Sequence, residues 1–322
     1  MKLGVLTVLY QKLSRTDALD RITELGIESV EFGTGNHPGN QHCDPDLLLG
    51  DDAALEELKR DVESRGLAIS ALSCHGNPLH PDDAVAVAAH ETWRRTAQLA
   101  SALEVPVVNL FSGCPGDHPG ARYPNWVTCA WPEDYSEVLE WQWNEKIIPY
   151  WQREAEFARE QGVRVAFEMH PGFAVYNPET LLRLRSAAGN VIGANFDPSH
   201  LYWQGIDPVE AIKVLGTEGA IFHVHAKDTC VDRANVRING VLDTKGYDRL
   251  LERSWVFRTV GYGHGEDAWR AQISALRAVG YDYVMSIEHE DALMSIDEGL
   301  AKAVAFLKPL IIKEEPAEMW WA

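Results

Sequence analysis

The residues best suited to chemistry stand in four short polar sequences in the second half of the chain. Each follows an apolar or β-branched run, so it places acidic or histidine side chains where a strand would end. The four sequences are Phe-Glu-Met-His-Pro at 167–171, Asn-Phe-Asp-Pro-Ser-His at 195–200, His-Val-His-Ala-Lys-Asp at 223–228 and Ile-Glu-His-Glu-Asp at 287–291. Carboxylates and imidazoles are the ligands of hard and borderline metals and the usual acid–base catalysts.

The alternation of side chains along a strand predicts which of these residues face the interior. His223, His225 and Lys227 share one face of their strand, and the apolar residues between them share the other. The apolar face is expected to pack on helices, so the polar face should point into the protein. By the same parity, Glu168 and His170 face in one direction.

Convergence of the acidic side chains predicts a metal site. Burying one carboxylate is costly, and three that converge would also repel one another. A single divalent cation bound by Glu168, Asp197, Glu288 and one histidine would remove that repulsion. We expect His225 to be the histidine ligand and interpret His223 as a core histidine below the metal. The oxygen-rich set favours Mn²⁺, with Mg²⁺, Co²⁺ and Zn²⁺ as alternatives.

The elements that must position these residues form a regular series. Eight β-branched or apolar runs alternate with amphipathic segments, which predicts βαβ units and a parallel sheet. The runs begin near Leu3, Ser29, Leu67, Pro106, Val163, Val191, Ala220 and Asp282. Eight units favour a closed barrel, so the predicted fold is α/β, a single (β/α)8 TIM barrel. We expect one domain over 1–322, with a short C-terminal tail at 312–322 that carries Trp320 and Trp321.

Two connections, at about 112–134 and 228–266, are too long for plain barrel loops. Each follows a strand and precedes a helix, which puts it over the C-terminal mouth of a barrel, where active sites lie. Such loops are typical lids or binding loops, although a surface insertion or a subunit contact is the alternative. The residues expected to bind substrate, in these loops or on the strands, are His75, Asn109, Trp126, Trp131 and Arg233.

Composition and charge narrow the classes of function. The formal net charge is −19, which disfavours nucleic acid and anionic membranes as partners. The five cysteines are widely spaced and form no C-x-x-C pair, as expected of reduced thiols in the cytoplasm. No apolar stretch is long enough to span a membrane, and the N-terminal run is interpreted as a first strand rather than a signal peptide.

The chain resembles the sugar phosphate isomerase/epimerase family of the xylose-isomerase-like barrel superfamily. The resemblance covers essentially the whole chain. It rests on the sequences at 25–33, 167–168, 196–200, 223–228, 260–263 and 287–291, the last of which resembles the branch that contains the large subunits of C-glycoside deglycosidases. It implies that Glu168, Asp197, His225 and Glu288 bind the metal and that His200 lies near the metal or substrate. An arginine that grips substrate in the epimerases is replaced by Val231, and Arg233 is the nearest substitute.

The chemistry implied by the resemblance is proton removal beside a carbonyl of a sugar, inosose or keto-glycoside. Isomerisation, epimerisation or elimination depends on where the proton returns. The candidates for acid–base work are Glu168, Glu288, His170, His200 and Lys227. A homo-oligomer, or a hetero-oligomer with a small subunit as in the deglycosidases, is expected. The alternatives are an apurinic/apyrimidinic endonuclease, which the acidic charge disfavours, and a non-catalytic interaction subunit, which would have lost the metal ligands.

Overall fold

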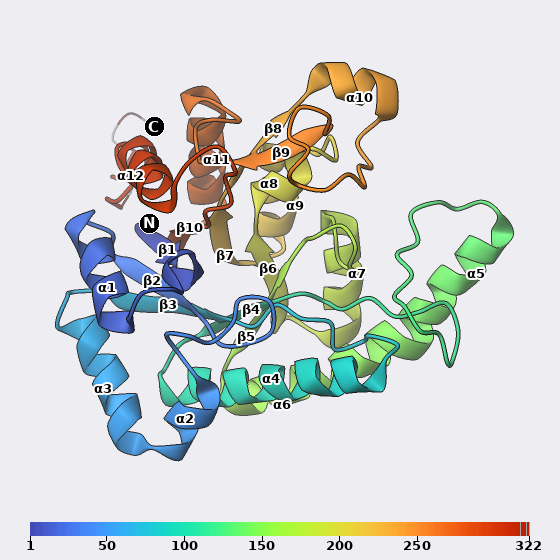
Figure 1. Cartoon of the computed structure of the whole chain (residues 1–322), viewed down its shortest axis with the longest axis horizontal. Helices are drawn as coiled ribbons and strands as arrows, with labels where there is room; N and C mark the ends of the chain where they lie inside the picture. Colours follow the sequence, from blue (N-terminus) through green and yellow to red (C-terminus); the bar gives the residue numbers. More distant parts are fainter. Residues whose placement is uncertain (316, 320, 322) are drawn as a thin grey trace.

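Eight strands close into a barrel in the computed structural model, which describes residues 1–315, 317–319 and 321. All neighbouring barrel strands are parallel, in the order β1-β10-β7-β6-β5-β4-β3-β2 (Figure 1). The strands are β1 (Lys2–Leu6), β2 (Ser29–Gly33), β3 (Ala68–Ser73), β4 (Val107–Leu110), β5 (Arg164–Glu168), β6 (Ile192–Phe196), β7 (Ile221–Ala226) and β10 (Val284–Ile287). The predicted (β/α)8 barrel is therefore confirmed.

Helices surround the barrel and bury its outer face. The longer ones are α1 (Arg15–Glu24), α3 (Asp52–Glu63), α4 (Asp83–Ala102), α6 (Ile148–Gln161), α7 (Pro178–Ala188), α9 (Pro208–Thr217), α11 (Glu266–Ala278) and α12 (Ile296–Leu307). The shorter ones are η1 (Thr7–Tyr10), α2 (Pro45–Gly50), α5 (Glu133–Trp141), the π-helical turn η2 (Gln142–Ile147) and α8 (Pro198–Tyr202). Their apolar faces supply large buried side chains such as Trp93, Trp151 and Trp269, which join strand residues in one core cluster.

Side chains cap the N-termini of several helices. Asn177, Asp207 and Ser295 each accept a hydrogen bond from a backbone amide two or three residues further on, at 2.9, 2.8 and 3.3 Å. Each of these caps satisfies one of the amides that a helix N-terminus leaves without a partner. Proline at the first helical position follows both Asn177 and Asp207.

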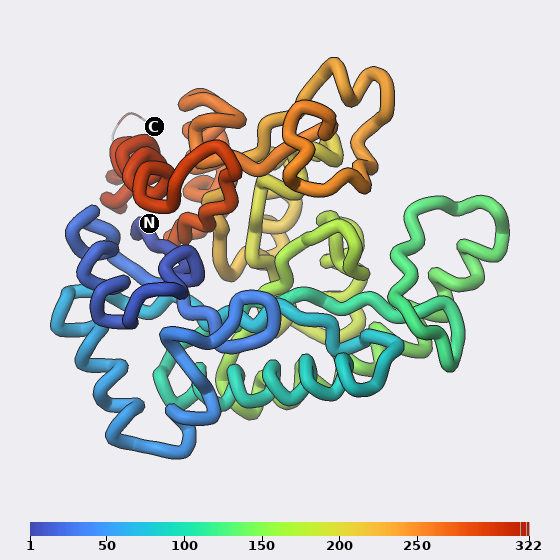
Figure 2. Tube along the Cα trace, in the orientation of Figure 1, coloured from blue at the N-terminus to red at the C-terminus, as the bar shows by residue number. Residues whose placement is uncertain are grey.

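The two long connections differ in what they contain. The segment 112–132 carries no helix or strand before α5 begins, whereas the second connection, predicted as a loop, contains elements of its own. They are β8 (Asp228–Val231), α10 (Arg233–Asn239) and β9 (Trp255–Arg258), and β8 pairs antiparallel with β9. Both connections project beyond the barrel, 112–141 in green and 228–258 in orange (Figure 2).

The two ends of the described chain meet beside β1. The Met1 amino group donates a 2.9 Å hydrogen bond to the carbonyl of Ile312, and Lys313 pairs with Glu28 at 2.8 Å. The beginning of the tail thus packs on its own barrel. Of its two tryptophans, Trp320 lies outside the described residues. None of the described helices is both long enough and apolar enough to cross a membrane.

Candidate metal centre

Four side chains from four neighbouring strand ends meet inside the mouth of the barrel. Glu168 ends β5, His225 lies on β7, Asp197 follows β6 and Glu288 follows β10. Each offers one ligand atom, and these four atoms all lie within 4.8 Å of one another. The sequence predicted these four residues as ligands of one cation, and the structure brings all four together. We call them the metal group.

Three of these ligand atoms are buried without a hydrogen-bond partner in the described part of the chain. They are Oδ2 of Asp197, Nδ1 of His225 and Oε2 of Glu288. Nδ1 of His225 lies 3.0 Å from Oε2 of Glu288 and 3.2 Å from Oε2 of Glu168. Buried polar atoms in proteins are nearly always satisfied, so a shared set of potential ligand atoms without hydrogen-bond partners is typical of a cation site. Three carboxylates and one imidazole fit a divalent cation.

Asp197 divides its two oxygens between structure and site. Its Oδ1 accepts a 2.8 Å hydrogen bond from the amide of Ser199 and so caps the short helix α8. Its Oδ2 is left for the metal group and lies 3.3 Å from Nε2 of His200. Burial, together with the nearby carboxylates of Glu168 and Glu288, raises the pKa of Asp197 to about 6. A cation bound at the site would reverse that shift, because it would stabilise the charged form.

Histidines surround Glu168. Nε2 of His75 lies 3.1 Å from Oε2 of Glu168, and Nε2 of His200 lies 3.0 Å from Oε1. Burial by itself would raise the pKa of Glu168, but the rings of His75, His200 and His225 lower it well below its ordinary value. His170 packs on His200, with 4.1 Å between ring centroids, and its Nδ1 donates to the carbonyl of Pro171. Burial, with His200 nearby, lowers the pKa of His170 to about 3.

Lys227 is a buried cation beside the group. Its Nζ lies 3.3 Å from Oε2 of Glu288, 4.0 Å from Oδ2 of Asp197 and 2.6 Å from Oε2 of Glu290. It also lies 4.3 Å from the centroid of the Phe257 ring. Burial would lower the pKa of Lys227, but the carboxylates of Glu288 and Glu290 raise it well above its ordinary value. The ammonium group therefore stays charged at neutral pH and can stabilise an anion or donate a hydrogen bond.

A polar cavity opens directly above these residues. Its volume is about 160 Å³, and Glu168, Lys227 and Glu288 line it together with His75 and His170. A second cavity of about 400 Å³ shares two lining residues, His170 and Glu290, with the first. Its other walls are mainly apolar and come largely from the second long connection and β9.

The sequence-predicted substrate contacts lie in several places. His75 is at the site, but Asn109 is buried below it, where its amide donates to Glu31. Trp126 packs edge-on against Tyr176 and lines a separate cavity beside α5 and α7. Trp131 is 78% exposed, and Arg233 lies exposed at the start of α10. The described structure does not bring these last three to the metal group, so their contact with substrate stays a prediction.

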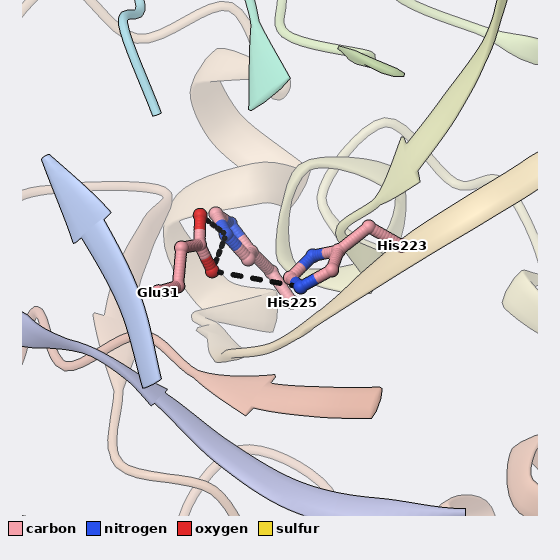
Figure 3. A group of neighbouring side chains, drawn as sticks. All are labelled: Glu31, His223 and His225. Carbon is pink, nitrogen blue, oxygen red and sulfur yellow. Dashed lines mark hydrogen bonds and ion pairs between the residues drawn. The ribbon is translucent and has the colours of Figure 1, made fainter. Parts of the chain in front are cut away.

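Two acidic residues that the sequence argument did not select belong to the site region. Glu290 lines both cavities. It stands two residues after Glu288, so strand alternation could have predicted that it faces the same side. Glu31 lies in the middle of β2 and accepts hydrogen bonds from Nε2 of His225 at 3.0 and 3.1 Å (Figure 3). His223 has hydrogen-bond partners on both ring nitrogens, Asn195 among them, and is the satisfied core histidine that was predicted.

Comparison with known proteins agrees with this architecture. The chain matches the family described as xylose isomerase-like TIM barrel over residues 19–310. It is 37% identical over 314 residues to the uncharacterized protein YfiH of Bacillus subtilis (strain 168). The aligned region covers 97% of this chain and 99% of that protein. It is also 34% identical over 152 residues to the rhizopine catabolism protein MocC of Rhizobium meliloti, covering 47% of this chain and 43% of that protein.

Solved structures share the fold at low sequence identity. The probable 3-DHS dehydratase AsbF from Bacillus anthracis has a TM-score of 0.66 at 17% identity, covering 96% of this chain and 99% of that one. The IOLI protein with a bound zinc atom gives 0.65 at 17% identity, with 97% and 98% covered. A D-psicose 3-epimerase in the presence of D-fructose gives 0.61 at 14% identity, with 97% and 99% covered. The family match and the YfiH relative, each spanning most of the chain, show that this protein belongs to the xylose isomerase-like TIM barrel family.

Proposed function

We propose that this protein is a divalent-metal-dependent isomerase or epimerase that removes a proton next to the carbonyl group of a neutral, polyhydroxylated substrate. The observation that carries the proposal is the convergence of ligand atoms from Glu168, Asp197, His225 and Glu288 beside a cavity, three of them without a hydrogen-bond partner among the described residues. Structures with related folds include a D-psicose 3-epimerase and a zinc-bound protein, which supports the choice of chemistry.

Glu168, Asp197, His225 and Glu288 would hold the metal. Three carboxylates and one imidazole favour Mn²⁺, with Mg²⁺, Co²⁺ or Zn²⁺ as alternatives. When bound, such a cation stabilises the negative charge that develops on a carbonyl oxygen as the neighbouring proton leaves. Two of the four ligands, Glu168 and Glu288, line the cavity of about 160 Å³, which is where substrate oxygens would enter.

Side chains of the protein would move the proton and orient the substrate. Glu168 and Glu288 are the candidate bases, because both are ionised carboxylates that line the polar cavity. Lys227, held charged, would bind a hydroxyl or carbonyl oxygen of the substrate or donate a proton to it. Neutral His170 and the neighbouring His200 would act as auxiliary groups that orient the substrate or relay the proton.

The test combines metal analysis with hydrogen exchange. Protein purified without chelator should contain about one equivalent of divalent metal, as one four-ligand site implies. Incubated in D₂O with a panel of ketoses, inososes and keto sugars, it should place deuterium on a carbon next to the carbonyl. Removal of the metal should abolish that exchange, and its return should restore it. Full exchange by metal-free protein, or cleavage of abasic DNA with no exchange in any sugar, would overturn the proposal.

A second candidate is the large subunit of a C-glycoside deglycosidase that acts on 3-keto glycosides. The adjoining cavity of about 400 Å³ favours it, because Tyr247, Leu250, Val256 and Phe257 provide an apolar wall beside the polar site. Such a wall suits a substrate that joins a sugar to an apolar or aromatic group. The two candidates share proton removal beside a carbonyl and differ in whether a leaving group departs.

Product analysis separates the two candidates. Keto-glycosides with aromatic aglycones should be incubated with the metal-loaded protein, alone and with candidate small subunits, and the products resolved by chromatography. Release of the free aglycone supports the deglycosidase. Deuterium exchange with the glycosidic bond intact supports the isomerase or epimerase. Size-exclusion chromatography with light scattering would test the predicted homo- or hetero-oligomer at the same time.

A further inference from the structure

Glu31 is a fully buried carboxylate in the middle of β2 that accepts hydrogen bonds from side chains on four other strands. His225 on β7 donates to it, and Asn109 on β4 donates to Oε1 at 2.8 Å. Ser286 on β10 donates to Oε2 at 2.7 Å, and Ser73 on β3 donates to Oε1. These contacts occupy both carboxylate oxygens, so the residue is held in one position by five of the eight barrel strands.

Glu31, His223 and His225 form a group that has the composition of a second cation site (Figure 3). The contacts of His223 argue against that interpretation. Its Nδ1 lies 3.1 Å from Oδ1 of Asn195, and its Nε2 lies 3.2 Å from Oγ of Ser70. Its Nε2 is also 3.8 Å from Glu31, beyond hydrogen-bond distance. A cation here would have to displace partners from every ligand, whereas the group around Asp197 has unpartnered atoms.

We propose that Glu31 is a positioning residue that orients His225 toward the metal site. A carboxylate can only accept, so its contacts with Nε2 place a proton on that nitrogen and leave the lone pair of the neutral ring on Nδ1. Nδ1 is the atom that faces Glu168 and Glu288. Hydrogen bonds from the second nitrogen of a ligating histidine to a carboxylate fix its tautomer and increase its basicity.

Glu31 and His225 come from strands that are not neighbours in the barrel. In the barrel, β7 and β2 are separated by β10 and β1, so Glu31 reaches His225 across the interior rather than from a neighbouring strand. Asn195 and His223, which are hydrogen-bonded to each other, also lie in the barrel interior. Glu31 contacts Nε2 of the His225 ring, whereas Glu168 and Glu288 lie beside its other nitrogen, Nδ1. The inference rests on the proposed metal site and adds a residue that does not touch the metal.

The test is the metal affinity of Glu31→Gln, measured apart from turnover. Metal-free protein is titrated with Mn²⁺, and separately with Zn²⁺, in competition with a chromophoric chelator. We expect Glu31→Gln to bind each metal about 10–100-fold more weakly than wild type, the usual effect of removing such a partner. Glu28→Gln is the matched control, since it makes the same change of charge on a partly exposed carboxylate that pairs with Lys313. It should bind metal like the wild type.

Circular dichroism melting of the metal-free proteins shows whether each variant is folded. If Glu31→Gln does not fold, Glu31→Asp decides: it keeps the charge but withdraws the oxygens by one methylene, and it should still weaken metal binding. Wild-type affinity in a folded Glu31→Gln, or in Glu31→Asp if only that variant folds, would overturn the inference. Absence of metal binding in the wild type would instead overturn the proposed function, so the two failures are distinguishable.

Discussion

At the residue scale, Asp197 and His225 each use one atom for a structural hydrogen bond and present another to the proposed metal site. Asp197 caps α8 with one oxygen and offers the other to the metal group. His225 is held through one nitrogen and offers the other. Because each role uses a separate atom, a conservative substitution can remove one role and leave the second in place.

Asp197→Asn should separate the two roles. The asparagine oxygen can still cap α8, and asparagine is as good an N-cap as aspartate. The negative ligand is lost, so metal affinity should fall while the melting temperature of the metal-free protein stays close to that of the wild type. Elemental analysis after dialysis and calorimetry of the metal-free proteins measure the two effects. Wild-type metal content in the variant would show that Asp197 is not a ligand.

Glu168→Gln and Glu288→Gln should reveal whether either residue is also a base. Glutamine retains an oxygen that can bind the metal but cannot accept a proton as carboxylate does. We expect proton exchange with solvent to slow by about 10²-fold or more in the variant that lacks the base. The exchange rate is measured at saturating metal, with metal content determined for each variant. A variant that keeps its metal and exchanges at nearly the wild-type rate has lost only a ligand.

The positions of acidic and histidine residues at strand ends were sufficient to predict the four ligand candidates, although parity alone does not separate His225 from His223. Glu31 could not be selected in this way. It stands alone in the sequence Ser-Val-Glu-Phe-Gly, and its partners, such as Asn109 and Ser286, are far away in the chain. The side chains of Trp126 and Trp131 were also beyond prediction, since periodicity does not describe the path of an irregular loop.

At the element scale, Asp228 organises the turn that follows β9. Its Oδ2 accepts hydrogen bonds from the amides of Gly261, Gly263 and His264 at 3.0, 3.1 and 2.9 Å. A Cβ on Gly263 would collide with the carbonyl of Thr229, which explains the glycine at that position. Asp228 thus faces this turn while its neighbour Lys227 faces the metal group, so the two do not form the rim ion pair that adjacent opposite charges suggest.

Asp228→Asn should destabilise the protein more than an ordinary surface substitution. The side-chain NH₂ group of asparagine would face backbone N–H groups that now donate to the carboxylate. At least one of these backbone N–H groups would lose its hydrogen-bond partner. Hydrogen bonds to a charged group contribute about 1.5–3 kcal/mol each, so we expect the free energy of unfolding to fall by about 2 kcal/mol or more. Asp232→Asn, at the exposed cap of α10, is the control and should be nearly neutral. Urea unfolding of both variants makes the comparison, and equal stabilities would contradict this account.

The regular elements were predictable because each has a local signal. Apolar runs mark the eight barrel strands, and caps such as Asn177 and Asp207 mark helix starts. The hairpin of β8 and β9 had no such signal, since its two short strands are separated by 23 residues that include α10. Asp228 on β8 also binds the turn after β9, and such contacts between distant residues are tertiary information.

At the scale of the whole molecule, the barrel closes by joining the first strand to the last. β1 pairs with β10 in parallel register, and the amino group of Met1 contacts Asp282 just before β10. Closure leaves no barrel strand edge unpaired and places the polar strand ends on one side, where the metal group lies. The core also contains buried side chains from every barrel strand and from most helices, so groups with no part in the site can report on global unfolding.

The cysteines can be used to follow global unfolding in this way. Cys43, Cys74 and Cys114 are buried, and burial raises the pKa of each thiol to about 12, from an ordinary value of 9.0. Cys129 is exposed, and Cys230 is partly exposed. Since the thiolate is the reactive form, the native protein at pH 8 should react with Ellman's reagent rapidly at Cys129 and more slowly at Cys230. The three buried thiols should react only after denaturant is added.

The same thiols predict how stability changes in alkali. In the unfolded chain they lose their protons near pH 9.0, whereas in the folded protein they keep them until about pH 12. The folded state therefore binds more protons over this interval, and the stability that the neutral buried thiols contribute falls as pH rises through it. Cys43→Ser, Cys74→Ser and Cys114→Ser should each make the loss of unfolding free energy between pH 8 and pH 10 smaller, whereas Cys129→Ser should leave it unchanged. Urea unfolding at the two pH values measures the difference, and an identical pH dependence in all four variants would show that the buried thiols do not cause it.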